Sequence, residues 1–192
     1  MDTNTDRNDV EDEEAMIALA KKDLQHFEPI YNRYYESIFR YVFRKTDDED
    51  VAADLTSKVF MNAMNAIHKF EYRGVPFGAW LYRIAANEAN KYFRESKRQL
   101  LALEDHKVRM VMNCGNLEEA DAEQKQKVLA ELIRELDDEE IQILELKFFE
   151  NKNFKEIAFI LEKKESAVKM KMYRSLNKLK ERYEKMNKLG DD

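Results

Sequence analysis

The sequence predicts an all-α protein made of two small helical domains that a flexible linker joins. Only four glycines and two prolines interrupt its 192 residues, and no sustained alternation of apolar and polar residues indicates a strand. Apolar residues instead recur every three or four positions, as they do along the buried side of an amphipathic helix. Because 38% of the residues are charged, we expect small cores.

The apolar periodicity divides the chain into five segments. We expect residues 1–14, which are dominated by acidic side chains, to form a disordered lead. Two helical domains follow at 15–98 and 127–186, with a loosely patterned linker at 99–126 between them. A short tail at 187–192 ends the chain.

Charge is also distributed in blocks. The net charge of −6 arises from acidic residues that precede the first domain and follow it, whereas residues 29–100 and 151–192 are net positive. Two basic segments with an acidic connector are typical of two DNA-contacting modules. Acidic and basic patches that pair within one fold would give the same pattern.

Polar residues mark the starts of several helices. Asp137 and Asn153 are predicted N-caps, and Thr46 with Glu49 three residues later has the form of a capping box. Paired acids such as Asp47-Asp48 and Asp137-Asp138 are therefore better explained as helix starts than as catalytic carboxylates.

The sequence argues against an enzyme and against a cofactor. It contains no Gly-rich phosphate loop and no nucleophile and base at a credible spacing. The single cysteine, Cys114, excludes a disulfide framework and a multi-thiolate zinc site, and the three histidines lack metal-ligand spacing. No apolar run approaches the roughly 20 residues of a membrane span, and the N-terminus lacks the features of a secretory signal. We therefore expect a cytoplasmic protein that does not insert into membranes.

Residues 70–98 place aromatic side chains beside cationic ones. A helix predicted there would carry one polar and cationic face, and aromatic residues lie just before and at its start. The face comprises Arg83, Asn87, Lys91, Arg94 and Arg98, and the aromatic residues are Phe70, Tyr72, Phe77, Trp80 and Tyr82. Aromatic rings that stack bases, next to cations that follow phosphates, are typical of single-stranded nucleic acid binding. For this stretch taken alone, a packed helix with a solvated cationic side is the favoured explanation.

Residues 153–178 have the pattern of a helix-turn-helix. A short apolar helix ends near Leu161, a turn follows at 162–164, and a second helix buries Val168 and Met172. The opposite side and flanks of the second helix present Ser166, Lys169, Met170, Lys171, Tyr173, Arg174 and Lys178. Arg174 could read a guanine edge, and the lysines are suited to hold phosphates.

Three sequence words resemble regions two and four of sigma-70-type transcription initiation factors, in particular the extracytoplasmic-function group. They are DLTSKVF at 54–60, WLYRIAAN at 80–87 and IAFILEKKESAVKMKMYRS at 157–175. Five residues depart from the family's usual pattern. Ser57-Lys58 stands where Gln-Glu is common, Lys91 stands where an acid is common, Glu162 replaces a turn glycine and Lys171 replaces an arginine.

The resemblance implies three interfaces. Residues Asp54, Ser57, Lys58 and Met61 would dock on the beta-prime clamp of core RNA polymerase. Residues Tyr72, Phe77, Trp80, Arg83, Asn87, Lys91 and Arg94 would open the minus-ten element, with Tyr72 and Phe77 the favoured base contacts. The helix from Ser166 to Lys178 would bind the minus-thirty-five element.

The resemblance thus predicts a sigma factor that binds core polymerase and directs promoter recognition, DNA melting and transcription initiation. Its implied partners are the beta-prime clamp and beta flap of the polymerase, promoter DNA and, as a candidate, an anti-sigma factor. A stand-alone helix-turn-helix regulator that never enters polymerase is the first alternative. A scaffold or anti-sigma-like decoy that does not bind DNA is the second.

Overall fold

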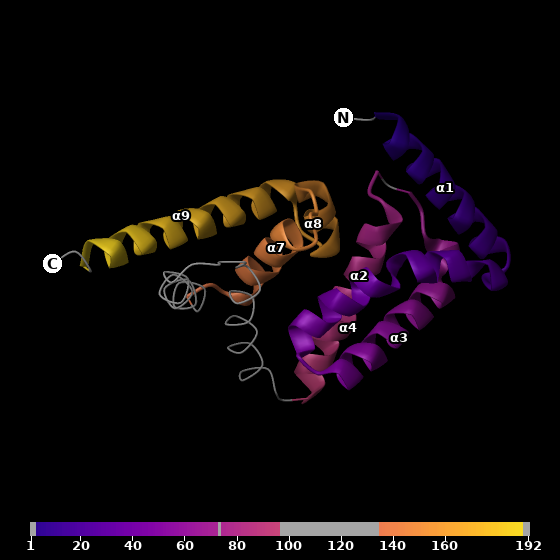
Figure 1. Ribbon diagram of the computed structural model, residues 1–192, viewed down its shortest axis with the longest axis horizontal. Coiled ribbons are helices and arrows are strands. Elements are labelled where there is room, and N and C mark those ends of the chain that lie inside the picture. The colour runs from indigo at the N-terminus through magenta and orange to yellow at the C-terminus, as the bar shows by residue number, and fades with distance from the viewer. Residues whose placement is uncertain (1–2, 73, 97–134, 190–192) are drawn as a thin grey trace, which may run out of the picture.

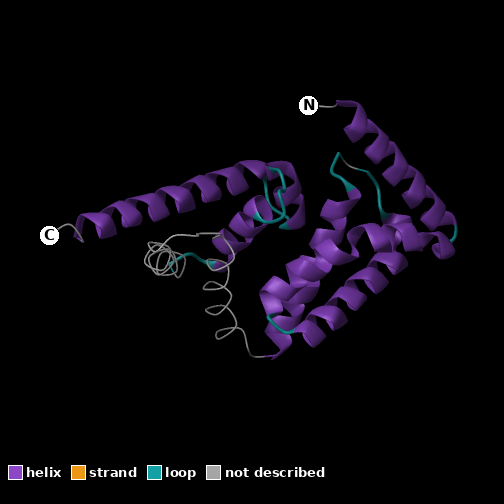
Figure 2. Ribbon diagram, in the orientation of Figure 1, coloured by secondary structure: helices purple, strands orange, loops and turns teal. Residues whose placement is uncertain are grey.

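The structure, a computed structural model, describes residues 3–72, 74–96 and 135–189. Every regular element in these ranges is helical, which confirms the predicted all-α class (Figure 2). The first unit contains α1 (Thr3–Lys22), α2 (Glu28–Thr46), α3 (Glu49–Ala66) and α4 (Phe77–Ser96), with short 3-10 helices at Leu24–Phe27 and Ile67–Lys69. The second unit contains α7 (Asp138–Phe148), α8 (Phe154–Ile160) and α9 (Glu165–Leu189). The expected linker at 99–126 lies outside the described residues.

The core of the first unit forms where α2, α3 and α4 pack together (Figure 1). Each helix contributes one apolar stripe, as its sequence period requires. Side chains with at most 2% of their surface exposed include Ile38, Tyr41, Val42, Val59, Phe77, Leu81 and Tyr82. This packing fixes α3 and α4 relative to each other, and both helices carry predicted interface residues.

Helix α1 corrects the expectation of a disordered acidic lead. It begins at Thr3 and runs to Lys22, so most of residues 1–14 are helical. Ile17 and Ala20 are buried on its inner side. The Glu13 carboxylate accepts hydrogen bonds from the Tyr34 hydroxyl and the backbone N–H of Phe77. Sequence composition missed this helix because a few buried contacts anchor an otherwise polar segment.

The turn between α2 and α3 differs from the predicted capping box. Asp47 ends α2 with a left-handed backbone, φ 51°. Asp48 then caps α3, because its carboxylate accepts from the N–H of Val51. The Thr46 hydroxyl donates to the carbonyl of Val42 instead. The observed N-cap therefore lies two residues after the predicted one.

The second unit contains the predicted helix-turn-helix. Asp137 and Asn153 cap α7 and α8 as expected, and both helices have complete capping boxes. Val168 and Met172 of α9 are buried against the shorter helices. Helix α9 continues to Leu189 and extends away from the rest of the molecule (Figure 1). The expected tail from residue 187 therefore begins inside a helix.

The two units contact each other along one surface, chiefly between α4 and α8 (Figure 1). We call this surface the joint. Ion pairs and cation–π contacts between α2 or α4 of the first unit and the segment from α7 to the turn before α9 also belong to it.

Candidate polymerase and nucleic-acid interfaces

The predicted polymerase-binding residues share the outer face of α3. Asp54, Ser57, Lys58 and Met61 are all exposed, and 61% of the surface of Met61 is accessible to solvent. The inner face of the same helix buries Leu55 and Val59 in the core. Spacings of three and four residues thus bring a carboxylate (Asp54), an ammonium group (Lys58) and an exposed thioether (Met61) onto one continuous surface. An exposed large apolar side chain beside charges is suited to protein contact.

The two favoured base-contacting aromatics lie in different environments. Tyr72 is 53% exposed in the loop before α4. Phe77 is fully buried, and its ring lies 4.9 Å from that of Phe70 and 5.1 Å from that of Trp80. The structure therefore does not bring Phe77 to a surface where a base could stack on it. Phe77 is buried because it starts α4 in the position that closes the aromatic cluster.

The residues of the predicted cationic face of α4 differ in their exposure to solvent. Asn87, Lys91 and Arg94 are exposed, whereas Arg83 is partly covered. The guanidinium of Arg83 forms an ion pair with Glu162 and lies 5.2 Å from the ring centroid of Phe159. Both partners belong to the second unit.

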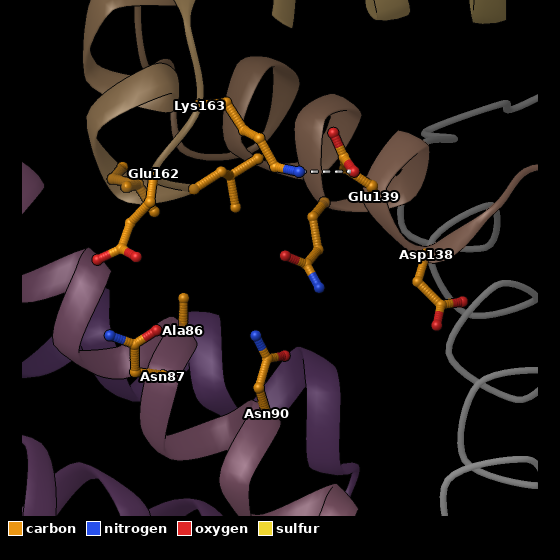
Figure 3. Close-up of a pocket in the computed structure, with 10 residues that line it drawn as sticks. Ala86, Asn87, Asn90, Asp138, Glu139, Glu162 and Lys163 are labelled. Atoms are coloured by element: carbon orange, nitrogen blue, oxygen red, sulfur yellow. Dashed lines mark ion pairs between the residues drawn. The ribbon is translucent and has the colours of Figure 1, made fainter.

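A polar cavity of about 260 Å³ lies beside this contact (Figure 3). One wall comes from α4, which contributes Asn87 and Asn90, and the other comes from the second unit. Glu162 and Lys163 line the cavity on the side of the second unit, and the Lys163 ammonium is 3.3 Å from a Glu139 oxygen. Asn87 therefore faces the helix-turn-helix turn across a narrow space.

The predicted recognition helix presents most of its residues to solvent. Ser166, Lys169, Met170, Tyr173, Arg174 and Lys178 are exposed, with Met170 and Tyr173 at 50% and 58%. The opposite face is fixed by the buried side chains of Val168 and Met172. Arg174 and Lys169 are therefore held on a rigid helix with their charges outward, as major-groove contact requires.

Lys171 lies apart from that outward face. Its ammonium is 3.1 Å from Asp137 and 3.4 Å from Glu139, both at the start of α7. Burial lowers the pKa of Lys171, but the hydrogen bond and charge of Asp137 outweigh this effect, so the pKa is raised. Lys171 therefore ties α9 to α7 in this structure.

A group of buried charges in the joint was missed by the sequence reading. Lys45 of α2 and Glu145 of α7 are 7% and 1% exposed, and their charged atoms are 3.0 Å apart. Arg44 lies 3.7 Å from Glu145 and also pairs with Glu150, which accepts a hydrogen bond from Tyr82. We call Arg44, Lys45, Glu145 and Glu150 the charge cluster. The sequence signal for this cluster is the position of Glu145 between two core leucines, Leu144 and Leu146, which indicates a buried acid.

The charge cluster perturbs its ionisable neighbours. Burial lowers the pKa of Lys45, but the Glu145 carboxylate and the Tyr41 hydroxyl raise it more, so the ammonium is strongly favoured. Burial raises the pKa of Tyr41 to about 12. Lys45 therefore carries a fixed positive charge at neutral pH.

The described residues contain no group of three or more His, Cys, Asp or Glu side chains that could hold a metal ion. Each helix in the described ranges is too short or too polar to span a bilayer.

Comparison with known proteins assigns both units. Residues 30–99 match the family model "Sigma-70 region 2", and residues 126–179 match "Sigma-70, region 4". Together these matches cover most of the chain.

The chain is also similar to named sigma factors. The chain is 28% identical to the ECF RNA polymerase sigma factor BldN of Streptomyces coelicolor over 80% of its own length, and spans 58% of BldN. It is also 28% identical to the ECF RNA polymerase sigma factor SigM of Bacillus subtilis, over 80% of this chain and 93% of SigM. Among solved structures, CnrH in complex with the cytosolic domain of CnrY shares the fold, with a TM-score of 0.61 and 19% identity over 88% of this chain and 94% of that one.

Proposed function

We propose that this chain, a member of the extracytoplasmic-function group of the sigma-70 family, directs transcription initiation and that its two units divide promoter recognition between them. The first unit binds core polymerase and opens the minus-ten element. The second unit places α9 in the major groove at the minus-thirty-five element.

The face of α3 is the proposed polymerase contact. Asp54, Lys58 and Met61 lie together on a helix whose other side is locked into the core, so the surface is preorganised. A helix face of this kind fits a groove between partner helices through one exposed apolar anchor, Met61, with charges around it. Lys58 is the part of this face whose charge differs from the family's usual pattern, and we expect it to alter affinity for a given core enzyme.

The loop and cationic face of α4 form the proposed minus-ten surface. Tyr72 supplies an exposed ring for a flipped or single-stranded base, and Asn87, Lys91 and Arg94 continue along the helix beside it. Trp80 is half-buried against Phe70 and supports the loop. Phe77 contributes to the core at the start of α4.

The exposed face of α9 is the single observation that carries the proposal for the second unit. It combines Arg174, which can reach a base edge, with Lys169 and Lys178, which are suited to phosphates. Ser166 lies at the N-terminal end, which enters the groove first in such motifs. Lys171 supports this face from behind through α7.

We also propose an anti-sigma protein as a regulator. CnrH, which shares the fold of this chain, was solved in complex with the cytosolic domain of CnrY. The exposed faces of α3 and α9 are surfaces that such a protein would have to block. The proposed place of action is the cytoplasm, where promoter DNA is.

A gel-shift assay with and without core polymerase tests the proposal. The protein alone should show no sequence-specific binding to duplex promoter DNA, and a specific complex should form when core enzyme is added. Tight specific binding without core would instead favour a stand-alone regulator and contradict the proposal. Arg174→Ala should weaken the specific complex, and indifference to this change would exclude α9 from base recognition.

A further inference from the structure

We propose that helix α1 positions the loop that carries Tyr72, because its residues Glu13 and Lys21 hold the two ends of that loop. The loop follows Phe70 and enters α4 at Phe77. This inference rests on the proposed function, in which Tyr72 receives a base of the minus-ten element. In this role Glu13 and Lys21 are positioning residues, which act through the loop and need not touch DNA.

Lys21 holds the start of the loop. Its ammonium donates a hydrogen bond of 2.5 Å to the carbonyl of Phe70 and lies 5.7 Å from the centroid of the Phe70 ring. The same cation thus binds the backbone and the side chain of one residue, through a charge-assisted hydrogen bond and a cation–π contact. Beside this contact, α1 packs against the 3-10 helix Ile67–Lys69, which leads directly into Phe70 (Figure 1).

Glu13 holds the end of the loop. One of its carboxylate oxygens accepts a hydrogen bond of 3.4 Å from the backbone N–H of Phe77, and the other accepts from the Tyr34 hydroxyl. Phe77 is the first residue of α4, so no carbonyl within the helix can accept from its N–H. The preceding residue is Pro76, whose side chain has no acceptor. A carboxylate from α1 therefore satisfies this N–H, at the end of α4 where the helix dipole favours negative charge.

Tyr34 of α2 fixes Glu13 from the other side. Glu13 is only 8% exposed, and a carboxylate in such a place is stable only when its oxygens accept hydrogen bonds. A Cβ built on Gly78 would lie 2.9 Å from a ring carbon of Tyr34, so this ring packs directly on the first turn of α4. Burial, and next the hydrogen bond to Glu13, raise the pKa of Tyr34, so the hydroxyl stays protonated and donates. Glu13 is thus held between α2 and α4.

The two anchors lie on one rigid helix. Glu13 and Lys21 are slightly more than two turns apart in α1, about 12 Å along its axis, and so share one side of it. Ile17 and Ala20 are buried between them and fix α1 to the core. Tyr72 itself remains 53% exposed. Because both ends of its loop are already held, less ordering is needed when the ring receives a base.

The fluorescence of Trp80 tests the proposal on the full chain, without DNA or polymerase. Trp80 is the single tryptophan, and its ring lies 5.4 Å from that of Phe70 and 5.1 Å from that of Phe77. Glu13→Ala and Lys21→Met should each increase the quenching of this fluorescence by acrylamide, while circular dichroism shows unchanged helicity. Equal quenching in the wild type and Glu13→Ala would overturn the proposal.

The rate of promoter opening by the reconstituted holoenzyme is the second measurement. Glu13→Ala should slow opening by about threefold to tenfold, as expected for the net loss of one hydrogen bond. Lys21→Met should have a smaller effect in the same direction, because Lys21 is exposed to solvent. Affinity for core polymerase should not change in either variant, since the proposed contact on α3 is intact. A loss of this affinity as large as the loss of opening would indicate a general structural role and overturn the proposal.

A double-mutant cycle tests whether Glu13 acts through Tyr72. In a Tyr72→Ala background, Glu13→Ala should slow opening no further, because the ring that the loop presents is already gone. Additive slowing would contradict the proposed route. Full opening by Tyr72→Ala alone would instead contradict the proposed function, and the Trp80 measurement would still decide whether α1 holds the loop.

Glu14→Ala and Lys22→Met are the matched controls. They remove the same charges from the same helix, one residue further along, where both side chains are exposed. Both should match the wild type in quenching and in opening, and an effect of Glu14→Ala equal to that of Glu13→Ala would overturn the assignment of Glu13. Tyr34→Phe is a milder variant, because it keeps the ring against Gly78 and removes only the donor to Glu13. It should increase quenching and slow opening, and wild-type values for both would contradict the proposal.

Discussion

Lys45 and Glu145 form an ion pair of 3.0 Å across the joint, with both side chains almost completely buried. The two residues come from helices of different units, so the pair exists only while the units are in contact. Its free energy is a small difference between desolvation and attraction.

A double-mutant cycle should reveal this coupling. Lys45→Met or Glu145→Leu alone leaves a buried charge without its main partner, and we expect either change to destabilise the contact between the two units by about 3–5 kcal/mol. The double replacement should be much milder than the sum, because two apolar side chains can pack where the charges met. The radius of gyration from small-angle scattering measures whether the two units are in contact. Additive effects of the two substitutions would contradict direct coupling between Lys45 and Glu145.

Tyr72 and Phe77 should separate function from stability. Tyr72→Ala should leave the unfolding free energy within about 0.5 kcal/mol of the wild type, because the side chain is exposed. It should weaken promoter opening by about 1–3 kcal/mol if the ring stacks on one base.

Phe77→Ala should instead lower the unfolding free energy by about 3–5 kcal/mol, because it empties the centre of an aromatic cluster. Denaturant unfolding and permanganate reactivity of the promoter measure the two effects. A stable Phe77→Ala protein with a specific opening defect would show that the buried position is wrong for the active form.

Lys169 and Lys171 are two residues apart on α9 but should behave differently. Lys169→Ala should flatten the log–log salt dependence of holoenzyme binding by about 0.9, the value for one lost phosphate contact. Lys171→Ala should leave that slope unchanged and reduce the stability of the second unit, because Lys171 binds Asp137 and Glu139. Equal loss of slope in both variants would place Lys171 on DNA.

Asp137 should make the second unit sensitive to acid. Burial raises the pKa of Asp137, but the backbone N–H of Glu140 and the ammonium of Lys171 lower it more, so it falls below its usual value of 3.8. A lowered pKa in the folded state stabilises the fold above pH 3.8, and this contribution disappears as the pH falls through the folded-state pKa. Unfolding free energies should therefore decrease from pH 5 to pH 3.

Two substitutions separate the cap from the charge. Asp137→Ala should cost about 1 kcal/mol at neutral pH through loss of the N-cap. Asp137→Asn retains the cap, so it should be milder and should reduce the acid dependence. Asp138→Asn is the matched control, since Asp138 follows the cap and changes the same charge. An acid dependence that Asp137→Asn leaves intact would assign it to other groups.

Local signals in the sequence were sufficient for much of the fold. The caps Asp137 and Asn153 and the buried stripe through Val168 and Met172 follow from spacing alone. The prediction of Thr46 as an N-cap is wrong because Asp48 offers a carboxylate two residues later. This carboxylate is the better acceptor, and it caps the start of α3.

Contacts between distant segments could not be predicted in this way. The loop position and aromatic neighbours of Phe77 predict a base-stacking site at the surface, whereas packing against Phe70 and Trp80 buries this residue. Helical spacing alone predicts a DNA contact for Lys171 like those of the other lysines, because spacing does not show that Asp137 faces it. The charge cluster unites residues from two units, and nothing in either local sequence specifies the partner.

Transcription by core polymerase reconstituted with this protein on fragmented genomic DNA tests the central claim most directly. We expect transcripts whose start sites share one pair of upstream elements, and we expect Asp54→Arg to abolish them while Glu36→Arg, an exposed charge reversal on α2, leaves them unchanged. Transcription that is independent of the added protein, or equally supported by Asp54→Arg, would contradict the assignment of α3 as the polymerase-binding face of a sigma factor.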